Sequence, residues 1–184
     1  KRQRLKLNKS QMSRSINLYN QLANHKLFSK SVNFGLKRIK LALDKLGHPE
    51  KKLKNVISVI GESGKFTTLF SLKSFIEANN QKVTTHISPS LRDIRERFYM
   101  GDKHLSHKEI KKTIKQIEKL NIPLTVFECL TLVYIINASK LNVDYNIQET
   151  GALWRLDSNN IHNFPKLQIC TNINKQHLNF LKRK

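Results

Sequence analysis

Residues 56–68 of the chain read VISVIGESGKFTT, and this stretch decides the fold. Its first part, Val56 to Ile60, is a short run rich in β-branched residues, which is typical of a buried strand. The glycines and polar residues from Gly61 to Lys65 then predict a turn. After the turn, apolar residues recur at helical spacing at Leu69, Leu72 and Ile76. One continuous segment therefore predicts the order strand, loop, helix.

This order is the context that a phosphate-binding loop requires. Backbone N–H groups at a helix start converge on an anion, a lysine neutralises a polyphosphate, and a hydroxyl can reach Mg²⁺. Lys65 and Thr67 can supply the lysine and the hydroxyl. The spacing is not the standard GxxxxGK[ST], because the residue five positions before Gly64 is Val59. A tight turn that only starts a helix remains the alternative interpretation of these residues alone.

Helical and extended patterns alternate on both sides of this stretch. Apolar residues three and four positions apart predict helices over 36–46, 110–120 and about 125–140. Extended segments are predicted over 81–87, 143–148 and 167–171, with a small hairpin over 97–105 around Gly101-Asp102. Strands that alternate with helices indicate an α/β fold with a mainly parallel sheet and flanking helices.

Composition disfavours two classes of protein. The chain has 184 residues, with 34 Lys and Arg against 13 Asp and Glu, which gives a formal net charge of +21. Lysines are scattered, however, and the densest cluster, Lys51, Lys52 and Lys54, is expected in a loop without aromatic residues that could stack on bases. No apolar stretch approaches the roughly 20 residues that span a bilayer. We therefore expect neither a nucleic acid nor a membrane as partner. The two cysteines lack the spacing of a disulfide framework or a metal site, which suits a reducing compartment.

The N-terminal segment is basic, and the chain begins at Lys1 rather than at a methionine. No acidic residue precedes Asp44, as in an organellar presequence. A basic tail is the simpler interpretation, because the cationic excess continues along the whole chain. We expect residues 1–28 to form a basic tail and a helix, and residues 29–184 to form part of an ATP-binding α/β domain.

Five blocks give the chain a family resemblance. They read VIGESGKFTT (59–68), HISPSLRDIRERF (86–98), LTVFECLT (124–131), QETGALWRLDSNNI (148–161) and CTNINKQH (170–177). Their order and spacing resemble the N-terminal ATPase domain of the folylpolyglutamate synthase/dihydrofolate synthase family, in the Mur ligase superfamily. The family's blocks read approximately VAGTNGKGST, YTSPHLVDFRERI, LTEFEALT, LEVGLGGRLDATN and ITNIGLDH. The segment FGLKRIKLALDKLG (34–47) also resembles the family's GLERI helix.

The resemblance implies an ATP-dependent carbon–nitrogen ligase of folate metabolism on a P-loop-type, Mur ligase-like fold. Such enzymes phosphorylate a carboxylate of folate or dihydropteroate with ATP, and the amine of L-glutamate then attacks the acyl phosphate. The resemblance implies Mg²⁺ as cofactor and ATP as co-substrate. We expect a cytoplasmic monomer, and the family's C-terminal ligase domain has no counterpart in these blocks, which suggests a fragment.

The family's functional positions transfer residue by residue. The resemblance implies ATP phosphate binding at Gly61, Glu62, Ser63, Gly64, Lys65 and Thr67, and Mg²⁺ ligands at Ser88, Glu149 and His177. Lys65, Glu149 and His177 are the implied catalytic residues. Pterin contacts are implied at Thr125, Val126, Phe127, Glu128, Leu156, Asp157 and Ser158. Judged by their residue types alone, a hydroxyl and a carboxylate suit Mg²⁺ better than an imidazole, and Arg155 could form a loop ion pair with Asp157.

Several positions depart from the family pattern. Phe66 replaces a glycine beside the lysine, and Glu62 brings a negative charge next to the expected triphosphate. Ser90 stands where the family has histidine, Leu153-Trp154 replaces Gly-Gly, and Gln176 replaces aspartate. Three hypotheses therefore remain open: a fragment of the ligase, a non-catalytic degenerate remnant that keeps the fold, and a basic nucleic acid-binding module supported by composition alone.

Overall fold

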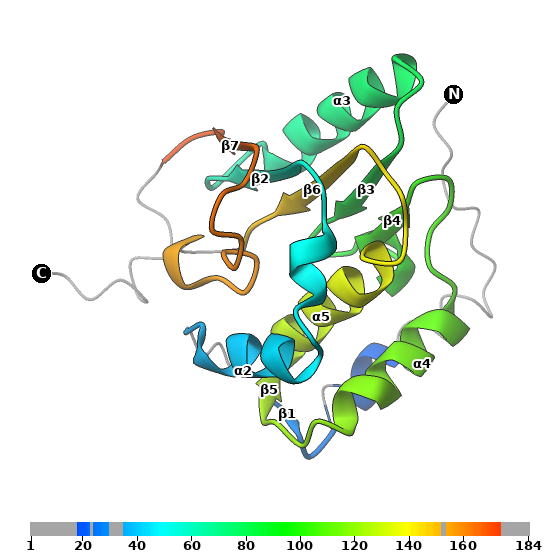
Figure 1. The fold of residues 1–184 in the computed structure, drawn as a ribbon, viewed down its shortest axis with the longest axis vertical. Helices are drawn as coiled ribbons and strands as arrows, with labels where there is room; N and C mark the ends of the chain where they lie inside the picture. Colours follow the sequence, from blue (N-terminus) through cyan, green and yellow to red (C-terminus); the bar gives the residue numbers. More distant parts are fainter. Residues whose placement is uncertain (1–17, 23, 30–34, 152–153, 174–184) are drawn as a thin grey trace, which may run out of the picture.

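A five-stranded sheet organises the molecule, whose computed structural model describes residues 18–22, 24–29, 35–151 and 154–173 (Figure 1). The strand order is β4-β3-β6-β2-β7. The strands are β2 (Val56–Ile60), β3 (Val83–His86), β4 (Phe98–Met100), β6 (Tyr145–Glu149) and β7 (Leu167–Cys170). All neighbours pair in parallel except β4, which pairs antiparallel with β3. The predicted α/β fold with a mainly parallel sheet is confirmed.

Helices cover both faces of this sheet. In Figure 1, α3 lies on one face, whereas α5 lies on the other with α2 and α4 packed outside it. The helices are α2 (Lys37–Lys45), α3 (Lys65–Ala78), α4 (His107–Glu118) and α5 (Val126–Ala138). Short 3-10 turns, η1 (Pro49–Lys52), η2 (Ile94–Arg97) and η3 (Trp154–Leu156), connect the main elements. No helix in the part of the chain that the structure describes is long and apolar enough to cross a membrane.

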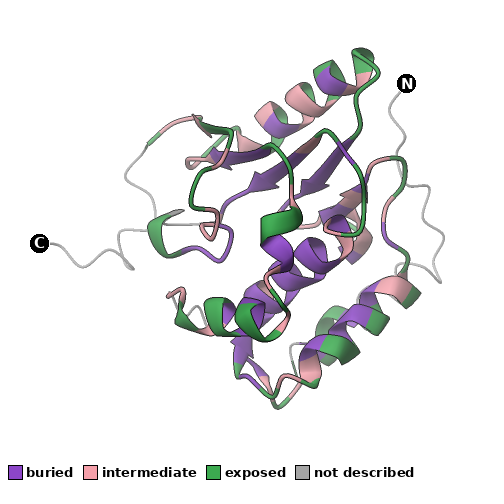
Figure 2. Ribbon diagram, viewed as in Figure 1, coloured by how far each residue is buried: buried purple, intermediate pink, exposed green. Residues whose placement is uncertain are grey.

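The main core surrounds α5. This helix has a nearly continuous apolar sequence, VFECLTLVYIINA, and eleven of its residues are buried, so it is purple along most of its length in Figure 2. α4 is instead amphipathic: Ile110, Ile114 and Ile117 face the core while lysines face solvent. A helix that is apolar on all sides belongs inside a fold, and one with an apolar stripe belongs at its surface.

A smaller core lies between α3 and the sheet. It contains Val59 of β2, Leu69 and Ile76 of α3, and Ile147 of β6. α3 leaves Phe75 exposed over 69% of its surface. The core on the α3 face of the sheet is therefore smaller than the core around α5.

A second, two-stranded sheet was not predicted. β1 (Phe28–Ser29) pairs in parallel with β5 (Leu124–Thr125), just before α5 begins. Leu18, Leu22 and Phe28 are buried in the main core. The described part of the basic N-terminal segment thus packs on the domain, and the boundary between residues 28 and 29 stays a prediction.

Of two local predictions, the hairpin is confirmed and the position of the lysine cluster needs correction. The small hairpin expected over 97–105 is present, although only its first arm, β4, is a strand: an antiparallel bridge joins Tyr99 to His104, and the Met100 and Leu105 N–H groups donate to the backbone oxygens of Lys103 and Phe98. Lys51 and Lys52 lie in the 3-10 turn η1 rather than in a loop. Pro49 starts this turn, where the fixed φ of proline suits a first helical position.

Candidate functional site

The loop Gly61–Gly64 connects the carboxyl end of β2 to the first residue of α3, as predicted. Both glycines have positive φ, 120° and 83°. A Cβ at Gly61 would lie only 2.8 Å from the backbone oxygen of Asn172 and would also overlap the Thr171 hydroxyl. The loop therefore needs glycine at position 61 for both its backbone angle and its close packing against the chain after β7.

Lys65 folds back over this loop. Its Nζ donates hydrogen bonds to the backbone oxygens of Gly61, at 2.8 Å, and Glu62, at 3.0 Å. The helix cap is Gly64, which has no side chain to accept from the N–H groups of the first turn of α3. Those N–H groups and the ammonium group are the donors that an anion at this helix start would use.

Ser63, Phe66 and Thr67 are exposed at the same helix start. The ring of Phe66 packs against that of Phe70 one turn later, with their centroids 4.4 Å apart. The bulky side chain that replaces the family's glycine thus lies along the flank of α3.

Ser88 and Glu149 come together beside the loop. Ser88 follows β3 and Glu149 is the last residue of β6, the strand between β3 and β2. The Ser88 N–H donates to Oε2 of Glu149 at 3.2 Å. Burial raises the pKa of Glu149, while the Ser88 N–H and the charges of Lys65 and Arg97 oppose that rise. The carboxyl ends of three neighbouring strands therefore place a lysine, a carboxylate and a serine at one edge of the sheet.

His177, the third expected Mg²⁺ ligand, lies outside the described residues. Within the described ranges, no three His, Cys, Asp or Glu side chains are grouped so that they could hold a metal ion. A cation at Glu149 would therefore need oxygens from a bound phosphate or water in addition to protein groups. That arrangement is usual for Mg²⁺, which is commonly bound by one or two carboxylates together with substrate phosphates.

Asp157 is buried in the segment after β6. Its Oδ2 accepts from the Gly151 N–H at 3.0 Å and its Oδ1 from the Asn159 N–H at 2.9 Å. Burial raises its pKa to about 6, against the opposing effect of these N–H groups and the charge of Lys65. The carboxylate thus fixes the turn between 151 and 159 by bonding backbone groups, and the alternative ion pair with Arg155 is not formed.

The other expected pterin positions differ in exposure. Ser158 is buried, and its hydroxyl lies 2.8 Å from that of Thr131 on α5. Leu156 is 44% exposed. Phe127 is half-buried, and its ring is stacked on that of His86 with a centroid distance of 6.3 Å.

Thr125 and Glu128 form a capping box at the start of α5. The Thr125 N–H donates to Oε2 of Glu128 at 2.7 Å, and the Glu128 N–H donates to Oγ1 of Thr125 at 3.1 Å. Arg38 of α2 pairs with both carboxylate oxygens of Glu128 at 3.0 Å. The Glu128 carboxylate is thus held by Thr125 and Arg38. Val126, the next residue after Thr125, is buried.

Two buried residues near the site were missed by the sequence analysis. His86 is fully buried in β3, its Nδ1 lies 3.3 Å from Oδ1 of Asn159, and burial lowers its pKa to about 3. Arg97 is also buried, and its charge lowers the pKa of Glu149, against the effect of burial. The signal for His86 was its position two residues before Ser88, because alternate strand residues share a face.

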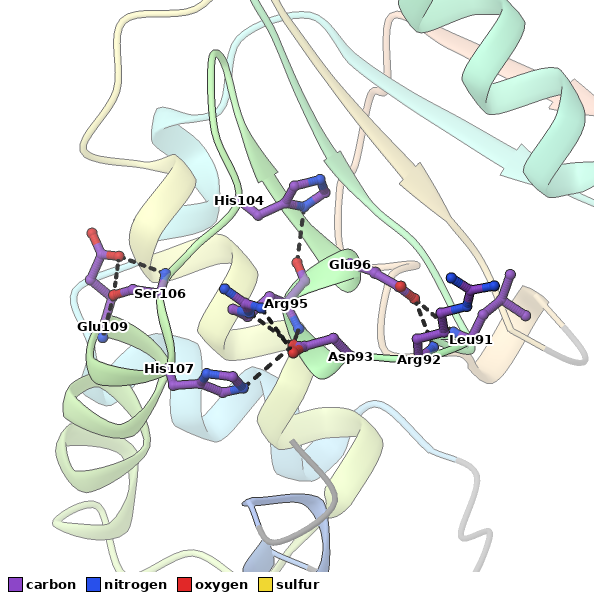
Figure 3. Close-up of polar contacts among 9 residues, drawn as sticks. All are labelled: Leu91, Arg92, Asp93, Arg95, Glu96, His104, Ser106, His107 and Glu109. Carbon is purple, nitrogen blue, oxygen red and sulfur yellow. Dashed lines mark hydrogen bonds and ion pairs between the residues drawn. The ribbon is translucent and has the colours of Figure 1, made fainter. Parts of the chain in front are cut away.

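Two carboxylates hold the segment that follows Ser88 (Figure 3). Asp93 accepts from the Arg95 N–H at 2.8 Å and pairs with its guanidinium group at 3.0 and 3.1 Å. His107 Nε2 lies 3.4 Å from the same Asp93 carboxylate. Glu96 accepts from the N–H groups of Leu91 and Arg92. Both carboxylates therefore shape the connection between Ser88 and β4.

A surface cavity of about 680 Å³ lies apart from these strand ends. The residues that line it include Lys40, His48, Glu50, Lys51, His162 and Lys166. None of the predicted site residues is among its lining residues, so this cavity is separate from the strand-end site.

Comparison with known proteins gives one consistent result, although no protein-family model matches the chain. The chain is 31% identical over 156 residues to the dihydrofolate synthase/folylpolyglutamate synthase of Bacillus subtilis, covering 80% of this chain and 36% of the relative. It is 34% identical over 137 residues to the Escherichia coli protein of the same description, covering 73% of this chain and 32% of the relative. The chain thus spans about a third of the length of these relatives.

Solved structures agree with the sequence relatives. A structure of Escherichia coli FolC with DHPP and ADP matches with a TM-score of 0.81 and 30% identity, over 92% of this chain and 40% of that one. A bifunctional folylpolyglutamate synthase/dihydrofolate synthase with Mn, AMPPNP and L-glutamate matches with a TM-score of 0.69 and 28% identity, over 83% of this chain and 36% of that one.

Proposed function

Because the chain belongs to the folylpolyglutamate synthase/dihydrofolate synthase family, we propose that it is the ATP-binding part of a ligase that adds L-glutamate to folate or dihydropteroate. The observation that carries the proposal is the meeting of Lys65, Ser88 and Glu149 at the carboxyl ends of β2, β3 and β6. A ligase of this kind needs a phosphate-binding loop and a carboxylate beside it at one place. In open α/β sheets, that place is the edge formed by the strand ends.

The proposed reaction has two steps. A carboxylate oxygen of the folate or dihydropteroate attacks the γ-phosphorus of ATP, which forms an acyl phosphate and releases ADP. The amine nitrogen of L-glutamate then attacks the acyl carbon, the C–O bond to phosphate breaks, and an amide, inorganic phosphate and a proton result. Neither step needs a nucleophilic side chain, so the protein contributes positioning and charge compensation.

We assign the phosphates of ATP to Gly61–Lys65 and Thr67. The ammonium group of Lys65 is already within 3.0 Å of two loop carbonyl oxygens, so a small movement would transfer it to a phosphate oxygen. The uncapped first turn of α3 would supply N–H donors, and the hydroxyl of Thr67 is exposed beside them. Lys65 would then offset negative charge that develops on the transferred phosphoryl group.

We assign Mg²⁺, a cofactor that neutralises the charge of a triphosphate, to Glu149 and Ser88, with His177 as a further proposed ligand. Glu149 places a carboxyl group at the strand ends beside the loop, although burial raises its pKa and so disfavours the ionised form. A cation would favour its ionised form. The Ser88 N–H fixes Oε2 of this carboxylate in position.

We assign the pterin to the surface between α5 and the turn after β6, at Thr125–Glu128 and Leu156–Ser158. Phe127 offers a half-buried ring there, and Asp157 a carboxyl group with a pKa of about 6. Such a group can accept a hydrogen bond from a heterocycle when it is ionised and donate one to it when it is protonated. Thr125 and Glu128 support this surface through the capping box and the pair with Arg38.

The remaining proposals concern the setting of the enzyme. We propose a cytoplasmic monomer of residues 29–184 as one nucleotide-binding unit, preceded by the basic segment 1–28. Nucleotide binding in the presence of Mg²⁺ separates the hypothesis of a degenerate, non-catalytic remnant from the leading one. A nucleic acid-binding module would instead show RNA affinity that falls steeply as salt concentration rises.

Calorimetric titration of the chain with Mg·ATP tests the proposal. We expect saturable binding that Lys65→Met weakens at least tenfold. The matched control is Lys111→Met, which removes the same charge from an exposed position on α4. Absence of binding by the unmodified chain, or equal losses in the two variants, would refute ATP binding at this loop.

A further inference from the structure

Asn172, in the segment after β7, bonds the backbone of the loop. Its side-chain Oδ1 accepts hydrogen bonds from two successive backbone N–H groups, Ser63 at 2.9 Å and Glu62 at 3.2 Å. Its backbone oxygen also lies 3.2 Å from the Glu62 nitrogen. One side chain, about 110 positions later in the chain, therefore bonds the middle of the predicted phosphate loop.

The neighbouring Thr171 bonds the last residue of β2, directly before the same loop. Its backbone N–H and its hydroxyl both donate to the Ile60 oxygen, at 3.0 and 3.2 Å. Gly61 is packed so closely against Thr171 and Asn172 that a Cβ would collide with both. The edge strand β7 thus continues directly into a support for the loop.

The N–H donors at this helix start fall into two groups. Those of Glu62 and Ser63 are bonded to Asn172, on the side of the loop that faces β7. Those of Lys65, Phe66 and Thr67 belong to the first turn of α3, whose cap residue Gly64 makes no side-chain hydrogen bond to them. Asn172 therefore bonds the flank of the loop and leaves the helix start available to an anion.

We propose that Asn172 is a positioning residue for the nucleotide, an inference that rests on the proposed function. Its carboxamide oxygen holds the N–H groups of Glu62 and Ser63 so that the loop keeps the shape in which Lys65 and the first turn of α3 can meet a polyphosphate. Asn172 does not contact the phosphates itself. A loop that is held in its binding shape before the ligand arrives loses less conformational freedom on binding.

The test compares Mg·ATP affinity in Asn172→Leu and Asn163→Leu variants of the full chain by calorimetry. Asn163 is exposed and provides the same substitution away from the loop. We expect about a tenfold loss of affinity for Asn172→Leu, and none for Asn163→Leu. Asn172→Ala, which only truncates the side chain, replaces the leucine variant if that variant fails to fold.

Amide hydrogen exchange provides a readout that general destabilisation would not reproduce. The N–H groups of Glu62 and Ser63 should exchange slowly in the unmodified chain, faster in Asn172→Leu, and slowly again in Asn172→Asp, which keeps an acceptor oxygen. They should stay slow when Mg·ATP is bound, because the contact persists.

The outcomes separate this inference from the proposed function. An unmodified chain that does not bind Mg·ATP refutes both. Binding by the unmodified chain with equal affinity in Asn172→Leu refutes only the positioning role. Tighter binding in Asn172→Leu also refutes it, because Asn172 would then be an internal competitor that the phosphates must displace.

Discussion

The layer around α5 and the strand-end site differ in what fills their interiors. Most of the residues that α5 buries are apolar, and its buried polar groups are paired, such as the Tyr134 hydroxyl with Thr84 Oγ1 at 2.8 Å. At the strand ends, Glu149, Asp157, His86 and Arg97 are all buried, and burial disfavours the charged form of each. Stability is therefore concentrated in the α5 layer, whereas the site keeps buried polar groups that weaken the fold locally and can serve chemistry.

The largest expected effect is in the α5 layer. Leu132→Ala removes a fully buried side chain and should lower the free energy of unfolding by about 3 to 4 kcal/mol, through lost burial and the cavity left behind. Urea unfolding followed by circular dichroism measures this loss. Leu41→Ala on α2, where the leucine is 49% exposed, is the control and should cost well under half as much. Equal losses at the two positions would contradict the assignment of Leu132 to the tightly packed core around α5.

A pH-dependent effect is expected at the strand ends. The pKa of Asp157 is raised to about 6 in the folded chain, from 3.8, the ordinary value of an aspartate. Below pH 3.8 the carboxyl group is protonated in both the folded and the unfolded chain, so it does not make the free energy of unfolding depend on pH there. Between pH 3.8 and 6 the unfolded chain releases this proton first, so the free energy of unfolding falls as pH rises, by up to about 3 kcal/mol.

Urea unfolding of the unmodified chain and of Asp157→Asn, at pH values from 4 to 7, isolates this contribution. The unmodified chain should lose stability relative to the variant as pH rises. Asp102→Asn, at an exposed position, controls for the loss of a carboxylate. A pH-independent difference between the unmodified chain and Asp157→Asn would show that Asp157 does not carry the effect.

A smaller effect is expected at the loop itself. Glu62→Thr together with Phe66→Gly removes a negative charge beside the proposed triphosphate and restores the family's glycine. Mg·ATP binding should tighten about tenfold in moderate salt, which corresponds to 1.4 kcal/mol. Calorimetry measures the change. Low-micromolar binding by the unmodified chain, with no gain in the double variant, would show that these departures are harmless.

The apolar pattern of the sequence was sufficient to predict helices and strands that are long enough to show it. The spacing of Ile110, Ile114 and Ile117 predicted α4, and the β-branched run at 56–60 predicted β2, because each element buries one stripe or one short run. β1 and β5 have two residues each, too few for any period to appear. Their pairing depends on contacts between Phe28 and Leu124, which are distant in sequence.

The site was predictable only in part, for a related reason. Strand ends and a family resemblance indicated Lys65, Ser88 and Glu149, but a side chain's bonding partner is not a local property. Glu128 pairs with Arg38, 90 positions away, and Asp157 bonds backbone N–H groups rather than its neighbour Arg155. Asn172 contacts the loop only because β7 pairs beside β2.

The pairing of β2 also sets the order in which the molecule can fold. Its two neighbours are β6 and β7, so Ile57 pairs with Ile147 and Leu167, 90 and 110 positions later. On a ribosome, β2 and the loop after it emerge long before either partner strand has been made. Closing such long loops is entropically costly and slows folding. The loop therefore acquires its final shape late, once Thr171 and Asn172 have been synthesised and β7 has docked.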